Sequence, residues 1–388
     1  MGNAPKALMI ATVASMIDLF NMDNIATLES LGYEVHVAAN FRFGNVTSQE
    51  RVDEFKQELL SRGIQVYDIP VPRNVASLKG ILHSYRIVKG ICSEHQYRIV
   101  HCHSPIGGVI ARLGAKEARE KYGTKVIYTA HGFHFYKGAP LKNWLIYYPI
   151  EKLCSIWTDV LITINKEDSC LAQRKMRAKK IRYIPGIGVN LDKFQFKTGN
   201  RERVRQELGI KPNEIMLLSV GELNKNKNHA IIIEALAAIG NKSLRYVIAG
   251  KGDLREYLEN LANKLGIAEQ VHLLGYRADV VELYKAADVF VHPSLREGLP
   301  ISVAEAMASA LPCITSKIRG SQDLIIPDKG GYLFDIKRPD QFTSAIEMLS
   351  HDPALRKAMG EYNALFMQRF SRDVVIADME NIYNQAVQ

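Results

Sequence analysis

One arrangement of apolar and helical segments occurs twice in this chain of 388 residues. The first copy is ALMIATVA (7–14), a loop, NIATLESLG (24–32) and YEVHVAAN (33–40). The second is IMLLSVGE (215–222), the loop LNKNKN, HAIIIEALAAIG (229–240) and LRYVIAG (244–250). Each copy has the pattern of a strand, helix and strand in a parallel sheet. Two copies about 200 residues apart predict an α/β chain with two domains, each built on a parallel sheet.

Further apolar runs extend both predicted sheets, and each ends in Gly, His, Ser or Asn. Ligands of parallel sheets gather at the carboxyl ends of the strands, so the polar residues just after these runs are the candidates for a site. The additional predicted strands cover 97–104, 125–132 and 160–165 in the first half and 271–275, 289–294 and 312–316 in the second.

A linker is indicated between the halves, where Pro185, Gly186 and Gly188 cluster. We therefore predict a first domain over 1–187 and a second over 188–370. The tail 371–388 has the pattern of a helix, with Ser371 as its N-cap.

The composition is that of a folded protein, with 47% hydrophobic and 23% charged residues. The five cysteines form no C-x-x-C pair, and no apolar run approaches the roughly 18 residues that a membrane span needs. These features favour a cytoplasmic protein. The net charge of +9 favours anionic partners, which include nucleic acid, a nucleotide substrate and an acidic membrane surface.

The stretch REGLPISVAEA carries two glutamates, Glu297 and Glu305, in an otherwise apolar segment. Pro300 is predicted to lie in the first turn of a helix, whose unpaired amides beside Gly298 and Leu299 would form an anion site. A helix rises only about 7 Å from Pro300 to Glu305, so the two carboxylates could bind hydroxyl groups at two ends of one phosphate-containing ligand. The alternative is a loop glutamate and a solvated helix position.

A second candidate anion site is the segment GELNKNKNH (221–229), which follows one strand and begins a helix. Lys225 and Lys227 in this loop suit a diphosphate, although an ordinary polar connection is the alternative. The glycines of AGKGD, among them Gly250, are a weak signal, and no G-x-G-x-x-G occurs. No D-x-D pair occurs either, so phosphate neutralisation without a metal is the working hypothesis.

Four histidines follow two predicted strands of the first half, in HCHSP and HGFH. No carboxylates or cysteines complete a metal site with them. We expect His103 and His131 to contact substrate, and His101 and His134 to be hydrogen-bonded core residues.

Two other segments suggest contact with an anionic membrane or a lipid-linked acceptor: RKMRAKKIR (174–182), with six basic residues, and the aromatic-rich LKNWLIYYPIEKLCSIW (141–157). The alternatives are a solvated basic face and a buried helix.

The ordered set GELNKNKN, AGKGD, LLGYRADV, ADVFVHPSLREGLPISVAEAMASALPCITS and GGYLF resembles the nucleotide-binding half of glycosyltransferase family 4. The segments TVASMIDLFNMDNI and TAHGFHFYKGAPLKNWLIYYPIEK are similar to a bacterial branch that builds capsular and exopolysaccharides. The resemblance implies a GT-B fold of two Rossmann-like domains with parallel sheets facing across a cleft. The acceptor would be held mainly by the first domain and the sugar nucleotide by the second, and the final helix would return to the first domain.

The resemblance also implies residue roles. Glu297 would contact the donor sugar hydroxyls, Glu305 the ribose, and Lys227 the phosphates. The amides of 298–301 would face the sugar and diphosphate, and His131 would reach the transferred sugar.

By the same resemblance, the backbone of 274–277 would meet the base, and a loop over Ser15 to Asn21 would lie near the phosphates. Most relatives have an arginine where this chain has Glu222, and Lys225 is our candidate to replace its charge. The candidate catalytic residues are His131, Lys227 and Glu297. The candidate donor-binding residues are Gly221, Glu222, Lys225, Lys227, Gly250, Tyr276, Arg277, Glu297, Gly298, Leu299, Pro300, Ile301 and Glu305. The candidate acceptor-side residues are Ser15, Asn21 and His103.

The expected activity is retaining, metal-independent transfer of a hexose or N-acetylhexosamine from a UDP-sugar, with no other cofactor. The expected acceptor is a saccharide, most simply one linked to polyprenyl diphosphate, in capsule or exopolysaccharide synthesis. Such an enzyme would act in the cytoplasm, in peripheral contact with the inner face of the membrane. One alternative keeps the fold but makes the protein a non-hydrolysing UDP-sugar epimerase. The other is a basic nucleic-acid-binding protein, which lacks support because no aromatic-basic recognition motif accompanies the charge.

Overall fold

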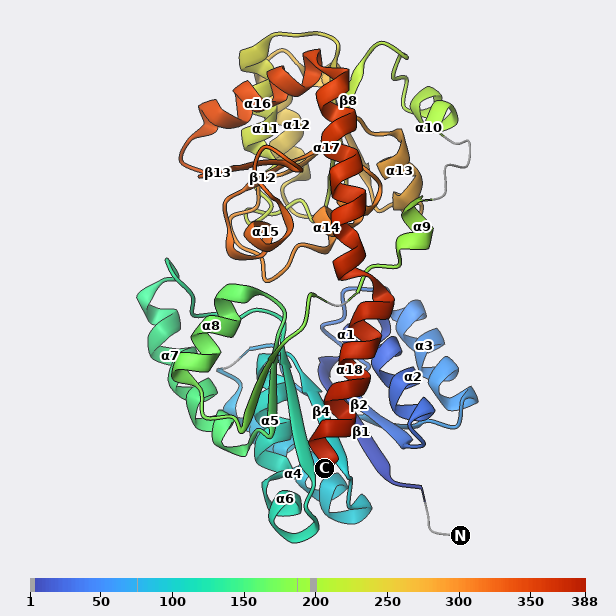
Figure 1. The fold of residues 1–388 in the computed structure, drawn as a ribbon, viewed down its shortest axis with the longest axis vertical. Coiled ribbons are helices and arrows are strands. Elements are labelled where there is room, and N and C mark those ends of the chain that lie inside the picture. The colour runs from blue at the N-terminus through green and yellow to red at the C-terminus, as the bar shows by residue number, and fades with distance from the viewer. Residues whose placement is uncertain (1–3, 75, 187, 196–200) are drawn as a thin grey trace. The chain divides into compact units, whose positions relative to one another are not determined.

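The computed structural model describes residues 4–74, 76–186, 188–195 and 201–388. The chain divides into an N-terminal unit, residues 1–187 with 373–388, and a C-terminal unit, residues 188–372. Each unit is a parallel sheet covered by helices (Figure 1). The two parallel sheets predicted from the repeated strand–helix–strand pattern, and the Rossmann-like domains implied by the family resemblance, are confirmed.

The N-terminal unit contains a seven-stranded sheet in the order β3-β2-β1-β4-β5-β6-β7. Its central strand β1 is apolar along nearly its whole length, and residues 7–11 are completely buried because helices cover both faces. The strands are β1 (Lys6–Val13), β2 (Glu34–Asn40), β3 (Gln65–Asp68), β4 (Ile99–His103), β5 (Lys125–Ala130), β6 (Val160–Thr163) and β7 (Lys180–Tyr183). The helices are α1 (Ala14–Phe20), α2 (Met22–Ser30), α3 (Gln49–Ser61), α4 (Leu78–His95), α5 (Pro105–Gly114), α6 (Lys116–Tyr122), α7 (Leu141–Cys154), α8 (Lys166–Lys175) and α18 (Arg372–Val387).

The C-terminal unit contains a six-stranded sheet in the order β10-β9-β8-β11-β12-β13. The strands are β8 (Ile215–Val220), β9 (Leu244–Ala249), β10 (Val271–Gly275), β11 (Val289–His292), β12 (Cys313–Ser316) and β13 (Gly331–Phe334). The helices are α9 (Leu191–Gln195), α10 (Arg201–Glu207), α11 (Ala230–Ile239), α12 (Arg255–Lys264), α13 (Val280–Ala286), α14 (Ile301–Ala308), α15 (Arg319–Leu324), α16 (Pro339–His351) and α17 (Pro353–Phe366).

The strand order reverses direction between β1 and β4 in one sheet and between β8 and β11 in the other. In open parallel sheets, the loops that follow the strands on either side of such a reversal diverge and leave room for a ligand. The loop 221–229 follows β8, and the segment 293–300 follows β11. Both candidate phosphate-binding segments therefore lie at the switch point of the C-terminal unit.

The C-terminal helix α18 packs on the N-terminal unit. The hydroxyl of Tyr383, which is completely buried, lies 2.8 Å from His101 Nδ1 at the centre of the sheet. Arg98 and Lys180 donate to backbone carbonyls near the end of α18. The implied return of the last helix to the first domain is thus observed as direct contact between α18, β4 and β7.

Two sequence predictions about local structure are wrong. The segment from Ser15 to Phe20 is not a loop, because helix α1 begins at Ala14 directly after β1. Pro300 is not inside the first turn of its helix. It is the N-cap of α14, in an extended conformation, and the helix starts at Ile301.

Candidate active site

The centre of the C-terminal switch point is an ion pair between Lys227 and Glu297. Lys227 Nζ lies 2.7 Å from Glu297 Oε1, and both side chains are about four-fifths buried. Two further bonds join their loops: Leu295 N donates to Asn226 O, and Asn226 Nδ2 donates to Arg296 O. Two predicted catalytic residues 70 positions apart in the sequence are therefore held together.

His292, at the end of β11, lies behind this pair. Its Nε2 is 3.6 Å from Glu297 Oε1, just beyond hydrogen-bonding distance, and the ring is almost completely buried. Burial alone would raise the pKa of Glu297, but His292 and Lys227 outweigh it and hold that pKa at about 2. Burial also lowers the pKa of His292. At neutral pH the site therefore contains an ionised glutamate beside a neutral imidazole.

The start of α14 presents backbone amides next to the pair. Pro300 O accepts from Val303 N and Ala304 N, whereas the amides of Ile301 and Ser302 have no backbone acceptor among the described residues. These two amides, at the positive end of the helix dipole, can bind an anion.

The backbone that carries these amides is fixed from behind. Arg319 Nε donates to Glu297 O at 3.0 Å. A Cβ atom on Gly320 would overlap Gly298 O, so only glycine allows α15 to approach this closely. Arg319 and Gly320 position the segment 297–300, a role that the sequence analysis did not predict.

Glu305 lies one turn further along α14. Its Oε2 accepts from the Tyr284 hydroxyl at 2.9 Å, and burial raises the pKa of this carboxyl above its ordinary value. It is a fixed, partly buried acceptor and not a solvated helix residue, which excludes the alternative interpretation of this position.

Two glycines allow close packing at the candidate site. Gly221 lies under the stem of Lys227, because a Cβ there would be 3.0 Å from Lys227 Cε. A Cβ on Gly250 would overlap Gly221 O, so β8 and β9 end in close backbone contact. Two of the three predicted donor-site glycines, Gly221 and Gly250, therefore have a steric reason to be glycine.

The predicted base-binding segment contains an exposed aromatic ring. Tyr276, after β10, is 72% exposed, and Lys251 Nζ lies 5.8 Å from its ring centroid. Arg277 instead pairs with Asp279 and Glu207 at 2.7 and 2.6 Å. The tyrosine ring is free to stack on a base, while the arginine side chain anchors the loop.

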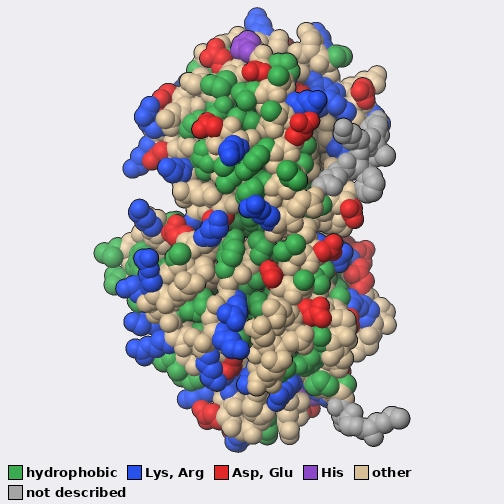
Figure 2. All heavy atoms as spheres, viewed as in Figure 1, with side chains coloured by type: hydrophobic (Ala, Val, Ile, Leu, Met, Phe, Trp, Pro, Cys, Tyr) green, Lys and Arg blue, Asp and Glu red, His purple; other side chains and the backbone are tan. Residues whose placement is uncertain are grey.

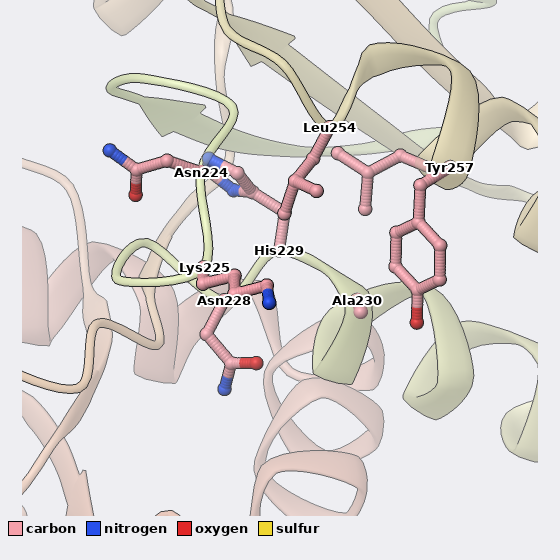
Figure 3. A pocket seen from close by; sticks show the side chains of 8 residues that line it. Asn224, Lys225, Asn228, His229, Ala230, Leu254 and Tyr257 are labelled. Carbon is pink, nitrogen blue, oxygen red and sulfur yellow. The ribbon is translucent and has the colours of Figure 1, made fainter.

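The structure does not bring Glu222 and Lys225 to the ion pair. Glu222 is exposed and accepts from Asn224 Nδ2, and Lys225 lines a separate cavity of about 370 Å³. Figure 3 shows the loop residues of this cavity facing Leu254 and Tyr257 of the α12 end. Among the described residues Lys225 makes no ion pair, and its role in replacing the charge of an arginine at position 222 stays a prediction.

In the N-terminal unit three predicted residues surround one small cavity of about 20 Å³, enough for about one water. They are Asn21, His103 and His131, with Thr129 beside them. His103 Nδ1 and His131 Nε2 share a hydrogen bond of 3.1 Å, and burial lowers the pKa of His131 to about 4. At neutral pH His131 is therefore an uncharged hydrogen-bonding group.

The remaining candidates of this unit divide into core and cavity residues. His101 is completely buried and bonded to Tyr383 and Thr129, as predicted for a core residue. Ser15 is also buried, and its Oγ accepts from Val46 N, which fixes a neighbouring loop. The prediction for His134 is wrong, because its ring is partly exposed and stacks on Tyr147.

His134 and Tyr147 line a cavity of about 250 Å³ at the N-terminal switch point. Thr12 and Ser104, at the ends of β1 and β4, also line this cavity, and so does Arg73. Aromatic rings, hydroxyls and a guanidinium suit a saccharide with a phosphate attached. Tyr147 belongs to the aromatic-rich segment 141–157, which suggested contact with a lipid-linked acceptor, whereas Arg73 was missed because no local pattern marks it.

Within the described ranges, no three His, Cys, Asp or Glu side chains come together as a metal site. No helix in the described part of the chain is both long and apolar enough to cross a bilayer.

Comparison with known proteins identifies the class. Residues 21–186 match the glycosyl transferase 4-like domain, and residues 200–366 match glycosyl transferases group 1. The chain is 40% identical to the putative glycosyltransferase EpsD of Bacillus subtilis, over 98% of this chain and 96% of that protein. It is 31% identical to the UDP-Gal:alpha-D-GlcNAc-diphosphoundecaprenol alpha-1,3-galactosyltransferase of Escherichia coli, over 77% and 78%.

Among solved structures, Anabaena HepE in complex with UDP superimposes with a TM-score of 0.78 at 18% identity, over 98% of this chain and 100% of that one. Two Rossmann-like units with parallel sheets, as in such solved structures, are the GT-B fold. The chain belongs to glycosyltransferase family 4, the group 1 glycosyltransferases, and the resemblance seen in its motifs is confirmed.

Proposed function

We propose that the protein transfers a hexose or N-acetylhexosamine from a UDP-sugar to a saccharide carried on polyprenyl diphosphate, with retention of anomeric configuration and without a metal. The observation that carries this proposal is the Lys227–Glu297 pair beside the amides of Ile301 and Ser302. It brings together a cation from the loop after β8 with an ionised hydroxyl acceptor and an anion-binding helix end from the segment after β11. The names of the Escherichia coli relative and of the HepE complex support the UDP donor and the diphosphate-linked acceptor.

In the donor site, Lys227 holds the diphosphate. An ammonium group has three donors, so Nζ can keep its contact with Glu297 and also donate to phosphate oxygens. The two amides of α14 stabilise the charge that develops on the leaving phosphate. Glu297 accepts from hydroxyls of the transferred sugar, Glu305 accepts from the ribose, and Tyr276 stacks on uracil.

Transfer then occurs on one face of the sugar. The bond from the anomeric carbon to the UDP oxygen breaks, and the acceptor oxygen bonds to that carbon from the same side. A phosphate oxygen of the departing UDP takes the proton of the acceptor hydroxyl, so no side-chain base is needed. His131, which is uncharged at neutral pH, donates a hydrogen bond to a hydroxyl of the transferred sugar.

The acceptor side lies in the N-terminal unit. The cavity lined by Arg73, His134 and Tyr147 has the size and chemistry for the sugar–diphosphate junction of the acceptor. An enzyme that uses such an acceptor works at the cytoplasmic face of the membrane, in capsule or exopolysaccharide synthesis.

The test is UDP release from a panel of UDP-hexoses and UDP-N-acetylhexosamines, with and without a polyprenyl-diphosphate saccharide. We expect release with one donor, dependent on the acceptor and insensitive to a chelator. Interconversion of UDP-sugars without an acceptor would instead establish the epimerase alternative. Chelator-sensitive release would contradict the metal-free mechanism.

A further inference from the structure

The C-terminal unit contains a second cavity, beside the loop that carries Lys227. It lies between the loop 224–230 and the start of α12, and we call it the α12 cavity. Its volume of about 370 Å³ is within the range of about 300–1,000 Å³ that is typical of small-molecule sites. Its lining includes neither Lys227 nor Glu297 among the described residues, so it is separate from the proposed donor site.

One wall of the α12 cavity is apolar and aromatic. Leu254 is the N-cap of α12, and the side chain of Leu258 is almost completely buried. The ring of Tyr257 is 53% exposed, and Figure 3 shows it across the cavity from Lys225 and Asn228. This wall therefore presents an apolar surface whose tyrosine also has a hydroxyl group at its tip.

The opposite wall carries polar groups with unused bonding capacity. Asn228 Nδ2 donates to Pro293 O, whereas Asn228 Oδ1 has no partner among the described residues. The exposed Lys225 side chain forms no ion pair in the described part of the chain. These two side chains leave an acceptor and a cation at the cavity.

The third polar residue of the lining is fixed and uncharged. His229 is bonded through Nδ1 to the Tyr246 hydroxyl at 3.0 Å and through Nε2 to Glu222 O at 3.3 Å. Burial lowers the pKa of His229 to about 4. At neutral pH the charge of the described lining therefore comes from Lys225.

These groups fit one class of ligand. Asn228 Oδ1 and the Tyr257 hydroxyl can accept from sugar hydroxyls, and the tyrosine ring can pack on the CH face of a sugar. The ammonium group of Lys225 attracts an anionic substituent. A saccharide that carries a carboxylate or a phosphate has all of these features. A nucleotide fits less well, because the amide nitrogen that could donate to a base edge is already bonded to Pro293 O.

We propose that the α12 cavity is a second ligand site, which binds an anionic saccharide. The proposal goes beyond the transferase function, since a protein without that activity could also hold a saccharide there. It gives Lys225 a different partner from the diphosphate predicted for it from the sequence. The ligand would contact the loop that carries Lys227: Asn224, which also lines the cavity, accepts from Lys227 N through its Oδ1 at 3.0 Å.

The test is ligand-observed NMR with the full chain, without UDP and then with UDP in excess. The probes are glucuronic acid and glucose 6-phosphate, with glucose as the neutral comparison and UMP as the nucleotide. We expect the anionic sugars to bind in both conditions, up to about fivefold more tightly than glucose, because an exposed lysine contributes no more than this. The two anionic sugars also compare a carboxylate with a phosphate as the bound group.

Three variants separate the contributions. Tyr257→Ala should weaken the binding of both anionic sugars about tenfold, because the ring contact is lost. Lys225→Met should lower their affinity to that of glucose and leave glucose binding unchanged. The matched control is Tyr276→Ala, which removes another exposed tyrosine ring of the same unit and should bind the sugars like the wild type. All three should unfold at the wild-type temperature, since each changed side chain is exposed.

Four results would overturn the proposal. They are absence of sugar binding by the wild type, sugar binding that Tyr257→Ala leaves unchanged, tighter binding of UMP than of the anionic sugars, and displacement of the sugars by UDP. Displacement would mean that the probes occupy the donor site. If the sugars bind as expected and no UDP-sugar is used, the transferase proposal fails and the second site stands.

Discussion

Replacing Lys227 with methionine tests the centre of the candidate site. Methionine keeps most of the stem that lies over Gly221 but removes the charge that contacts Glu297. Loss of one preorganised charge-stabilising group typically costs about 10²- to 10³-fold in turnover, or about 3–4 kcal/mol. We therefore expect kcat/KM of Lys227→Met to fall by about that factor with the preferred UDP-sugar.

The same substitution should lower stability in a pH-dependent way. The pKa of Glu297 falls from 4.5 to about 2 on folding, and the difference corresponds to at most about 3 kcal/mol, shared between Lys227 and His292. Because this pKa is depressed, the contribution is complete above pH about 4.5 and is lost as the pH falls towards 2. Urea unfolding should show a clear loss in Lys227→Met at pH 7 that shrinks near pH 3.

A second variant separates stability from catalysis. Lys227→Met/Glu297→Gln leaves no unpaired buried charge, so it should recover much of the lost stability without recovering turnover. Lys242→Met, which changes an exposed lysine of the same unit, is the control and should behave like the wild type. A kcat/KM for Lys227→Met within about threefold of the wild type would refute the assigned role, since removing a preorganised group that stabilises developing charge costs far more than this.

Three other outcomes follow from the structure. Gly250→Ala should destabilise the protein by about 1–3 kcal/mol in urea, because its Cβ overlaps Gly221 O, whereas Gly90→Ala in α4 meets nothing within 4 Å and should be neutral or stabilising. Tyr276→Ala should weaken UDP binding about tenfold in calorimetry at unchanged stability, since base stacking is lost from an exposed ring. Burial raises the pKa of Glu305, so this carboxyl takes up its proton at a higher pH than an ordinary carboxyl does. On acidification UDP affinity should therefore begin to fall at that higher pH, and Glu305→Gln should not show this fall.

The sequence predicted strands where both faces of the sheet are covered. Ten predicted runs correspond to strands; nine of them are interior strands, which need side chains that are apolar on both faces, and the tenth, β10, is an edge strand. The three strands that it missed, β3, β7 and β13, are all at sheet edges. The sequences of β3 and β7, QVYD and KIRY, mix polar and apolar residues because an edge strand is only partly covered, whereas β13, GYLF, is a short apolar run.

The role of the basic run at 174–182 could not be predicted from the sequence either. Lys180 and Arg182 belong to β7 and contact Gln385 of α18, and Lys179 pairs with Asp159. Half of the run therefore serves internal contacts, which only the tertiary structure reveals. By contrast, the outward face of α7 is evident only from exposure, because a buried aromatic helix and an amphipathic one have similar compositions.

At the candidate site, local motifs identified the residues but not their partners. Glu297 and Lys227 were predicted from a helix start and a lysine-containing loop. Their mutual contact depends on the adjacency of β8 and β11, which are distant in sequence. His292, Tyr284 and Arg319 act through the same long-range packing; His292 lies in the quoted ADVFVHPS motif but was given no role, and Tyr284 and Arg319 lie outside the quoted motifs.

The most direct test of the central claim is calorimetric titration of the wild type with UDP, compared with ADP and GDP. The account predicts that UDP binds with clear preference and that saturation at about 100 times Kd stabilises the fold by about 2.7 kcal/mol. It also predicts that Lys227→Met and Tyr276→Ala each weaken this binding. Preference for ADP or GDP, or UDP binding that is unchanged in both variants, would contradict it.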